Sequence, residues 1–132
     1  QIAASSGVDV RIMTPEKTDH PFVYGANSAY GGDLLKSGGR VYRYKKGFLH
    51  AKMLVIDDEL ATIGTANIDV RSFSLNFEIN AILYDQQLAI KCRELFEADI
   101  KESFELTKEL HEKRKTWTRI RESVSRLLSP IL

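Results

Sequence analysis

The chain has 132 residues, of which 43% are hydrophobic and 28% are charged, as in an ordinary globular domain. This composition excludes a disordered chain and a collagen-like repeat, and the single cysteine, Cys92, excludes an internal disulfide framework. No apolar run approaches the roughly 20 residues that cross a bilayer, and no signal-peptide pattern opens the chain, so we expect this fragment to be soluble.

Two features of the sequence are unusual: the way the chain begins and the uneven distribution of its charges. The chain starts at Gln1 and runs into Gly7 without a capping residue, so we expect it to begin inside a helix of a longer protein. The net charge is only +1, yet residues 36–56 carry six Lys and Arg residues and no acid, and residues 113–132 carry six basic residues and one acid. The chain therefore contains two basic segments although its net charge is close to zero.

The first part of the chain alternates strand and helix patterns. Apolar and charged residues alternate over residues 8–12, which predicts a strand. A helix is predicted to start at Pro21 and to end before Gly38-Gly39. Residues 41–44 are β-branched and aromatic, which favours a second strand.

The middle of the chain predicts an antiparallel hairpin followed by another strand and a long helix. Residues 48–56 and 60–64 are mainly apolar and flank the polar turn at residues 57–59. Residues 76–84 alternate as a strand, and residues 86–114 lack Gly and Pro and place apolar residues, Cys92 among them, at helical spacing. We expect Cys92 to pack in the core. The whole pattern predicts an α/β fold, with a mixed β-sheet flanked by helices and a long C-terminal helical region.

A group of chemically useful residues surrounds the predicted hairpin. His50 and Lys52 are two apart in the predicted strand, so both side chains would leave the same face and form a phosphate site. Imidazole works as nucleophile or general acid near neutral pH, and the ammonium neutralises phosphoryl oxygens. Thr65 and Asn67 follow the hairpin and would bring hydroxyl and amide donors to the same place. The full spacing is His50-x-Lys52-x4-Asp57-x6-Gly64-Thr65-x-Asn67.

This spacing resembles the signature motif of the phospholipase D superfamily, and residues 66–78 and 126–132 resemble bacterial cardiolipin synthases. The resemblance covers most of the chain and implies a phospholipase D-type layered domain, the second half of a two-motif enzyme. It implies that residues 1–112 form a half-domain with one motif and that residues 113–132 form a basic amphipathic helix of the same domain. The implied location of the full-length bacterial protein is the cytoplasmic membrane.

The resemblance also implies a role for each motif residue. His50 would be one of two active-site histidines, either the nucleophile that carries a phosphohistidine or the general acid. Lys52, Thr65 and Asn67 would contact phosphate, and Glu78 would hold the histidine in place. Asp57 belongs to the motif, but it lies at a turn and an odd number of residues from His50, so we assign it to hairpin structure.

The implied reaction transfers a phosphatidyl group between two phosphatidylglycerol molecules, giving cardiolipin and glycerol. His20 and His111 lie outside any similar pattern, so the second motif would come from a missing N-terminal half or from a homodimer mate. No metal-ligand spacing is present, and the implied mechanism needs no cofactor. Two other functions remain open: a single-motif phosphodiesterase or nuclease acting as a homodimer, and an inert fragment that binds its partner half or a membrane. The basic block would suit a DNA backbone, but the family-specific stretch after Asn67 makes a nucleic-acid partner the weaker hypothesis.

The C-terminal tail has two interpretations. Trp117, Ile120 and Val124 recur at helical spacing among basic residues, as in a helix that lies on an anionic membrane surface. The alternative is that the tail packs on the domain or on the missing half.

Overall fold

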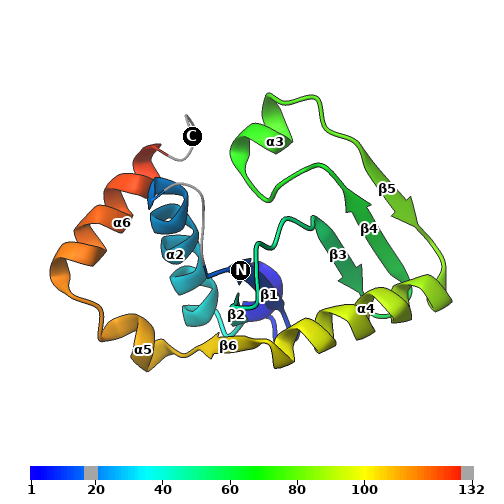
Figure 1. The fold of residues 1–132 in the computed structure, drawn as a ribbon, viewed down its shortest axis with the longest axis horizontal. Helices are drawn as coiled ribbons and strands as arrows, with labels where there is room; N and C mark the ends of the chain where they lie inside the picture. Colours follow the sequence, from blue (N-terminus) through cyan, green and yellow to red (C-terminus); the bar gives the residue numbers. More distant parts are fainter. Residues whose placement is uncertain (17–20, 129–132) are drawn as a thin grey trace. The chain divides into compact units, whose positions relative to one another are not determined.

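The computed structural model describes residues 1–16 and 21–128, which form two compact units (Figure 1). Unit 1 consists of Gln1–Leu49 and Glu102–Leu132, and unit 2 consists of His50–Lys101. His20 lies outside the described residues, and so do residues 129–132 of the stretch that resembles cardiolipin synthases.

Unit 1 is built on a three-stranded mixed sheet. Its order is β1 (Arg11–Pro15), β2 (Arg40–Tyr44) and β6 (Ser103–Leu106), with β1 parallel and β6 antiparallel to β2. The helices of this unit are α1 (Ile2–Ser5), α2 (Pro21–Lys36), α5 (Lys108–Glu112) and α6 (Thr116–Leu128). The expected opening helix, the helix from Pro21 and the strand at residues 41–44 are thus present. The first strand lies a few residues later than predicted, because Arg11 to Pro15 are the residues that pair with β2.

The core of unit 1 lies between the sheet and its helices. Ala4, Leu34, Leu35 and Val41 are buried together, and Ile12 and Leu106 pack against them. Leu34 and Leu35 belong to the last turn of α2, which places this helix on the strand that follows it. These two leucines therefore anchor the C-terminal end of α2 on β2.

Two glycines of α2 allow other helices to come close. A Cβ atom at Gly25 would lie 2.5 Å from Oγ of Ser125, which is fully buried in α6. A Cβ atom at Gly32 would lie 2.0 Å from Nε2 of His111 in α5. Glycine lowers helix propensity, but at these two positions any Cβ atom would force the neighbouring Ser125 or His111 side chain to move.

His111 is a neutral imidazole in this packed region. Burial, and then the positive charges of Arg114, Lys36 and Arg43, lower the pKa of His111 to about 4, against a smaller opposing effect of Asp33. The Arg114 guanidinium donates to Nε2 of His111 and pairs with Glu122 of α6, whose carboxylate is buried. Because arginine only donates, Nε2 must accept, which the neutral ring can do.

Unit 2 is an antiparallel sheet with one long helix (Figure 1). The strands are β3 (Met53–Ile56), β4 (Leu60–Gly64) and β5 (Asn80–Leu83), in that spatial order. Helix α3 (Val70–Ser74) lies between β4 and β5 in the chain, and α4 (Gln86–Lys101) follows β5. The predicted hairpin is confirmed, with Ile56 opposite Leu60.

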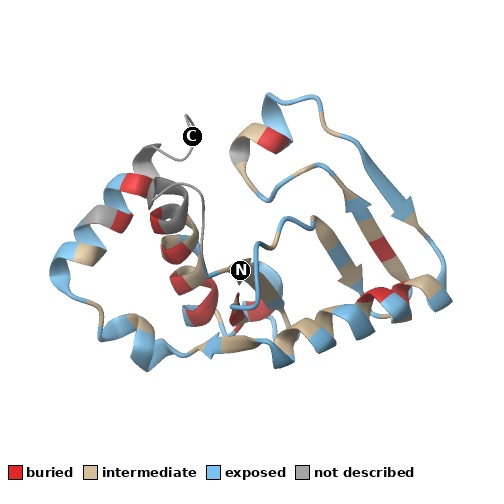
Figure 2. Ribbon diagram, viewed as in Figure 1, coloured by how far each residue is buried: buried red, intermediate tan, exposed pale blue. Residues whose placement is uncertain are grey.

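Helix α4 packs against β3 and β4, and Figure 2 shows buried residues on both α4 and this sheet. Ala89 and Cys92 are buried against Ala61 of β4, so the prediction that Cys92 packs in the core is confirmed. Arg93 adds an ion pair, with Nε 2.7 Å from Oδ1 of Asp58 in the hairpin turn. The turn is thereby tied to the helix as well as to its own strands.

The prediction of one helix over residues 86–114 is wrong. Helix α4 ends at Lys101, β6 follows, and α5 begins at Lys108. Residues 103–106 gain backbone hydrogen bonds to β2 and bring Leu106 to the core of unit 1, and this tertiary pairing outweighs the local helical pattern. The described part of the C-terminal region contains two helices, α5 and α6, rather than one.

Candidate active site

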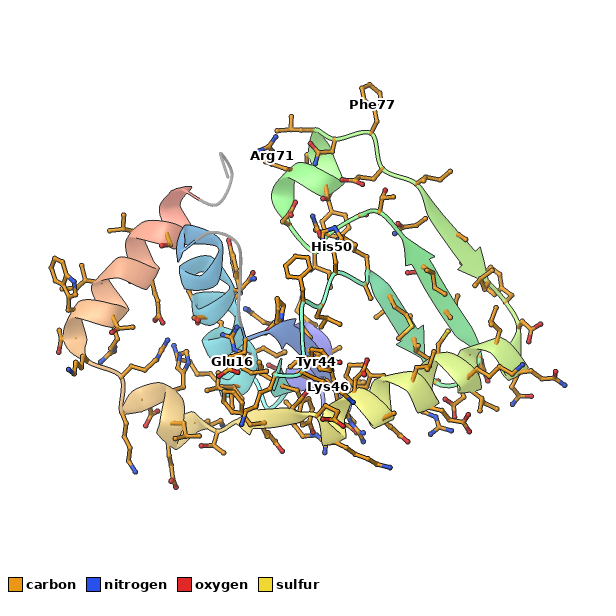
Figure 3. All side chains as sticks on the ribbon, viewed as in Figure 1. Glu16, Tyr44, Lys46, His50, Arg71 and Phe77 are labelled. Carbon is orange, nitrogen blue, oxygen red and sulfur yellow. The ribbon has the colours of Figure 1, made fainter. Side chains whose placement is uncertain are left out.

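His50 and Lys52 lie in an extended segment just before β3, not inside a strand as predicted. The strand starts only at Met53 because regular pairing with β4 ends at Ile63, opposite Met53. One further hydrogen bond, from the Gly64 amide to the Lys52 carbonyl at 3.1 Å, still holds the segment beside β4. Nζ of Lys52 donates to the His50 carbonyl oxygen at 2.9 Å. The side chain of His50 is exposed, and it is labelled in Figure 3.

Gly64 marks a close approach between β4 and β5. A Cβ atom here would lie 1.9 Å from Oδ1 of Asn80 and 2.2 Å from the carbonyl oxygen of Ile79. No real side chain tolerates such distances to backbone, so position 64 requires glycine. The glycine of the motif therefore allows the residues after β4 to lie directly against those before β5.

Thr65 uses this close approach to bind the segment before β5. Its amide donates to the Ile79 carbonyl oxygen at 2.9 Å, and its Oγ1 accepts from the Ile79 amide at 3.0 Å. The amide of Ala66 donates to Oδ1 of Asn80 at 3.2 Å. The backbone on both sides of Ile79 is thus fixed by the residues that follow Gly64.

Glu78, the residue before Ile79, has its carboxylate turned into this cluster. Oε1 accepts from Oγ of Ser72 at 3.1 Å and from Nδ2 of Asn76 at 3.2 Å. Hydrogen bonding by Thr65, then by Asn76 and Ser72, and the nearby charge of Lys52 lower the pKa of Glu78, so the carboxylate is ionised at neutral pH. Glu78 precedes β5 instead of lying in a strand, because pairing with β4 begins at Asn80.

Ser72 was not singled out by its sequence pattern, although it supports the carboxylate. It is buried in α3, and its amide donates to Oδ1 of Asp69 at 2.7 Å. Asp69 therefore caps α3 and fixes the serine that meets Glu78. The sequence does contain this signal, since Asp69 is a preferred N-cap residue type and stands directly before the helix.

The remaining motif residues lie at the edges of the cluster. Asn67 is exposed in the bend between β4 and α3. Asp57 lies in the hairpin turn, where it and Asp58 have φ angles of 49° and 56°, as in a type I′ turn. The structure thus brings Lys52, Thr65 and Glu78 together in unit 2 and places Asp57 at the far end of β3.

The cluster combines an ammonium group, a hydroxyl group and an ionised carboxylate beside the segment that carries an imidazole. Such groups stabilise negative charge on phosphoryl oxygens and move protons without a metal ion. Within residues 1–16 and 21–128, no group of three or more His, Cys, Asp or Glu side chains is placed to hold a metal. In the same part of the chain, no helix has the length and apolar character needed to cross a membrane.

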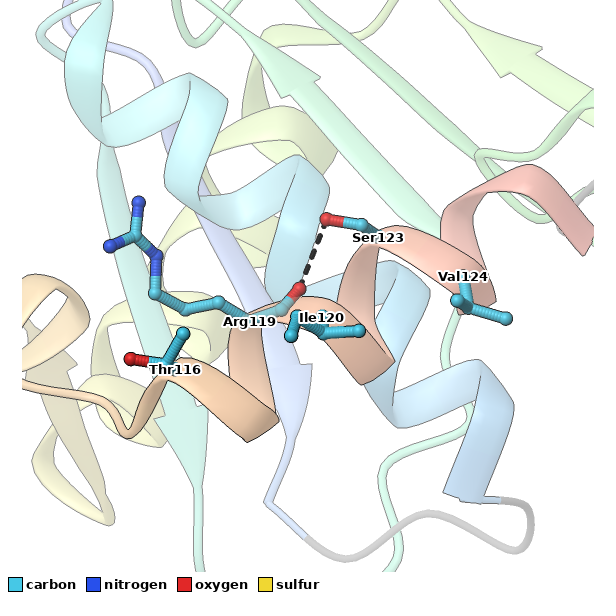
Figure 4. Close-up of a pocket in the computed structure, with 5 residues that line it drawn as sticks. All are labelled: Thr116, Arg119, Ile120, Ser123 and Val124. Atoms are coloured by element: carbon cyan, nitrogen blue, oxygen red, sulfur yellow. Dashed lines mark hydrogen bonds between the residues drawn. The ribbon is translucent and has the colours of Figure 1, made fainter.

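A hollow of about 380 Å³ lies elsewhere, along α6 (Figure 4). Its lining residues all belong to that helix: Thr116, Arg119, Ile120, Ser123 and Val124. Because no motif residue lines it, this hollow is a feature of the exposed side of α6 and not of the candidate active site.

Comparison with known proteins identifies the family. Residues 1–100 match the family described as "Cardiolipin synthase, PLD-like domain". The chain belongs to this family. Over all 132 residues it is 54% identical to a cardiolipin synthase of Listeria monocytogenes and 58% identical to the major cardiolipin synthase of Bacillus subtilis. In both cases it spans 27% of the length of the relative.

A solved structure supports the PLD-like fold of the chain. The crystal structure of phosphatidylserine synthase from Haemophilus influenzae is similar with a TM-score of 0.71 at 18% identity. The match covers 99% of this chain and 37% of the other. The α/β fold predicted for a PLD-like domain is therefore confirmed.

Proposed function

We propose that the protein to which this chain belongs is a phosphatidyltransferase that makes cardiolipin and glycerol from two molecules of phosphatidylglycerol. The observation that carries this proposal is the cluster of Lys52, Thr65 and Glu78 in unit 2, built from the motif of a PLD-like domain family. The names of the relatives, which give cardiolipin as the product, support this choice of reaction.

The chain supplies one histidine of the two that the reaction requires. In the first step, an imidazole nitrogen attacks phosphorus, the bond from phosphorus to the glycerol oxygen breaks, and the second histidine protonates that oxygen. In the second step, the same histidine deprotonates a hydroxyl group of the acceptor phosphatidylglycerol, which attacks phosphorus and breaks the bond to nitrogen. His50 takes one of these roles, and a second motif in the remaining length of the protein, or in a homodimer mate, takes the other.

Lys52 and Glu78 have opposite tasks in this scheme. The ammonium group of Lys52 neutralises the charge that gathers on the nonbridging phosphoryl oxygens, and Thr65 and Asn67 add hydrogen bonds to them. Glu78 stays ionised because three neighbours hydrogen bond to it, so it can orient an imidazole ring and stabilise its protonated form. Asp57 has a structural role in the hairpin turn.

The proposed enzyme acts at the cytoplasmic membrane, since both of its substrates are lipids. The basic face of the tail would contact anionic lipid there. On α6, Trp117, Ile120 and Val124 are exposed, whereas Glu122 and Ser125 face the interior. This leaves the apolar side of the helix available to a membrane surface.

The test is the turnover of the full-length enzyme that carries His50→Gln. The enzyme is supplied with phosphatidylglycerol vesicles, and the cardiolipin formed is measured by mass spectrometry. Loss of an acid, base or nucleophile should reduce turnover by about 10³-fold or more without loss of folding. Lys91→Gln, on the exposed side of α4, is the matched control and should keep full turnover.

Turnover of the His50→Gln enzyme within tenfold of the unchanged enzyme would reject the proposed role. Hydrolysis of DNA or of a phosphodiester dye by the unchanged enzyme, without cardiolipin formation, would favour the nuclease or phosphodiesterase hypothesis. The 132-residue chain alone should be inactive, because one motif lacks the second histidine.

A further inference from the structure

The segment from Ser72 to Ile79 sorts its side chains by chemistry. Ser72 and Asn76 both donate hydrogen bonds to the carboxylate of Glu78. The apolar residues between them face outwards. We call these four residues the apolar rim: Phe73, Leu75, Phe77 and Ile79.

The side chains of the apolar rim are far more exposed than large apolar side chains usually are. Phe73, Leu75 and Ile79 are 70%, 70% and 76% exposed, and Phe77 is fully exposed and points away from α3 and β5 (Figure 3). Ile68, just before α3, is also exposed. A contiguous set of large apolar side chains in water is unfavourable and marks a contact surface.

The rim cannot be rotated inwards without breaking the cluster described above. Phe77 and Ile79 flank Glu78 directly, and backbone hydrogen bonds from Thr65 fix Ile79. In this arrangement Glu78 is held by Ser72 and Asn76, while the side chains of its two neighbours are exposed. Exposure of the rim is thus coupled to the position of the carboxylate.

The charge of this segment favours an anionic lipid surface over a protein partner. Glu78 is the only acidic residue among residues 70–79, and it is turned inwards, while Arg71 supplies a positive charge on α3. The rim itself is a narrow element of four large apolar side chains on one short segment. Insertion into the headgroup region requires only such a narrow apolar element beside a basic residue.

We infer that the apolar rim inserts into the surface of a phospholipid bilayer beside the active site. The choice of lipid as partner rests on the proposed function, because the substrate of that reaction is itself part of the bilayer. With the rim inserted, the headgroup phosphate is presented at the level of Glu78 and Thr65, and the acyl chains stay in the membrane during transfer.

The first experiment replaces Phe77 in the full-length enzyme with the photocrosslinker p-benzoylphenylalanine, in vesicles of phosphatidylglycerol. Tyr84, another highly exposed aromatic residue of unit 2, is the matched control position. It lies at the other end of β5, about 16 Å along the strand from Ile79. We expect lipid adducts at position 77 and none at position 84, measured by mass spectrometry.

Lipid adducts at both positions, a crosslink from position 77 to protein, or no adduct at position 77 would each overturn the inference. A crosslink to protein would identify the rest of the enzyme or a second copy as the occupant. This arm does not depend on turnover, so it decides the inference even if the enzyme makes no cardiolipin and the proposed function fails.

The second experiment compares rates on long-chain phosphatidylglycerol in vesicles with rates on short-chain phosphatidylglycerol dissolved as monomers. Phe77→Ser should lower the ratio of the two rates about tenfold or more, because one large apolar side chain changes partitioning by that factor. Tyr84→Ser should leave the ratio unchanged. An unchanged ratio for Phe77→Ser, with both variants folded by circular dichroism, would refute insertion of the rim.

Discussion

Replacing Gly64 by alanine should disrupt the candidate active site through backbone displacement alone. The new methyl carbon would lie 2.2 Å from the Ile79 carbonyl oxygen and 2.6 Å from Cα of Asn80, so β4 and the segment before β5 must move apart. The two hydrogen bonds that backbone amides donate between Thr65 and Ile79 cross this gap. Movement here therefore releases the residue next to Glu78.

The cost follows from these contacts. Overpacking against backbone destabilises by about 1–3 kcal/mol, and each weakened hydrogen bond costs about 1 kcal/mol. The reduced freedom of alanine in the unfolded chain returns about 0.4–1 kcal/mol. We expect the free energy of unfolding to fall by about 2–4.5 kcal/mol, which corresponds to a shift of the urea midpoint of about 1–2 M.

Gly47→Ala is the matched control for this prediction. A Cβ atom at Gly47 has no neighbour within 4 Å, so this variant should unfold at the midpoint of the unchanged chain or slightly above it. Urea unfolding followed by far-UV circular dichroism measures both. If Gly64→Ala unfolds at the same midpoint as Gly47→Ala, the close approach of β4 and β5 does not constrain the site as we argue.

Three further predictions concern other parts of the chain. Because the pKa of His111 is lowered to about 4, the unfolded chain binds a proton before the folded chain does as the pH falls, so the stability that the neutral ring contributes is complete above about pH 6.5 and is lost towards pH 4. Thermal melts should show that His111→Gln loses less stability than the unchanged chain over this range. Equal losses in the two chains would contradict this prediction. Asp57→Asn should keep stability and turnover because asparagine tolerates positive φ, whereas Asp57→Val should lower the free energy of unfolding, measured in urea, by about 1–2 kcal/mol. A stable but inactive Asp57→Asn enzyme would show instead that Asp57 is catalytic. Because exposed Trp117 would enter a less polar environment on an anionic membrane, its fluorescence should shift to the blue with phosphatidylglycerol vesicles and not with neutral vesicles, and high salt should reverse the shift. An unchanged spectrum with the anionic vesicles would leave α6 as a packing helix only.

The hairpin of unit 2 was predictable because its signals are local. Two apolar runs flank a polar turn, and Asp57 and Asp58 tolerate the positive φ angles that a tight turn needs. The motif spacing then indicated which residues meet, and the structure places Lys52, Thr65 and Glu78 in one cluster. The role of each of them in catalysis stays a prediction.

The predictions that failed depend on long-range pairing. Nothing between Lys101 and Ser103 breaks a helix locally, and only the partnership with β2 makes residues 103–106 a strand. Thr107 offered a weak hint, because its Oγ1 caps α5 by accepting from the Leu110 amide. The start of β3 likewise depends on where β4 turns away to meet β5, which no pattern around His50 reveals.

The division of the chain has a consequence for the order of folding. Unit 2 is one continuous stretch, from His50 to Lys101, with every strand paired to its neighbour in sequence. In unit 1, Val41 must wait for Leu106 before β2 gains its second neighbour. During synthesis on the ribosome, the sheet that carries the motif can therefore form early from contacts of low sequence separation, while the mixed sheet closes only when the C-terminal residues emerge.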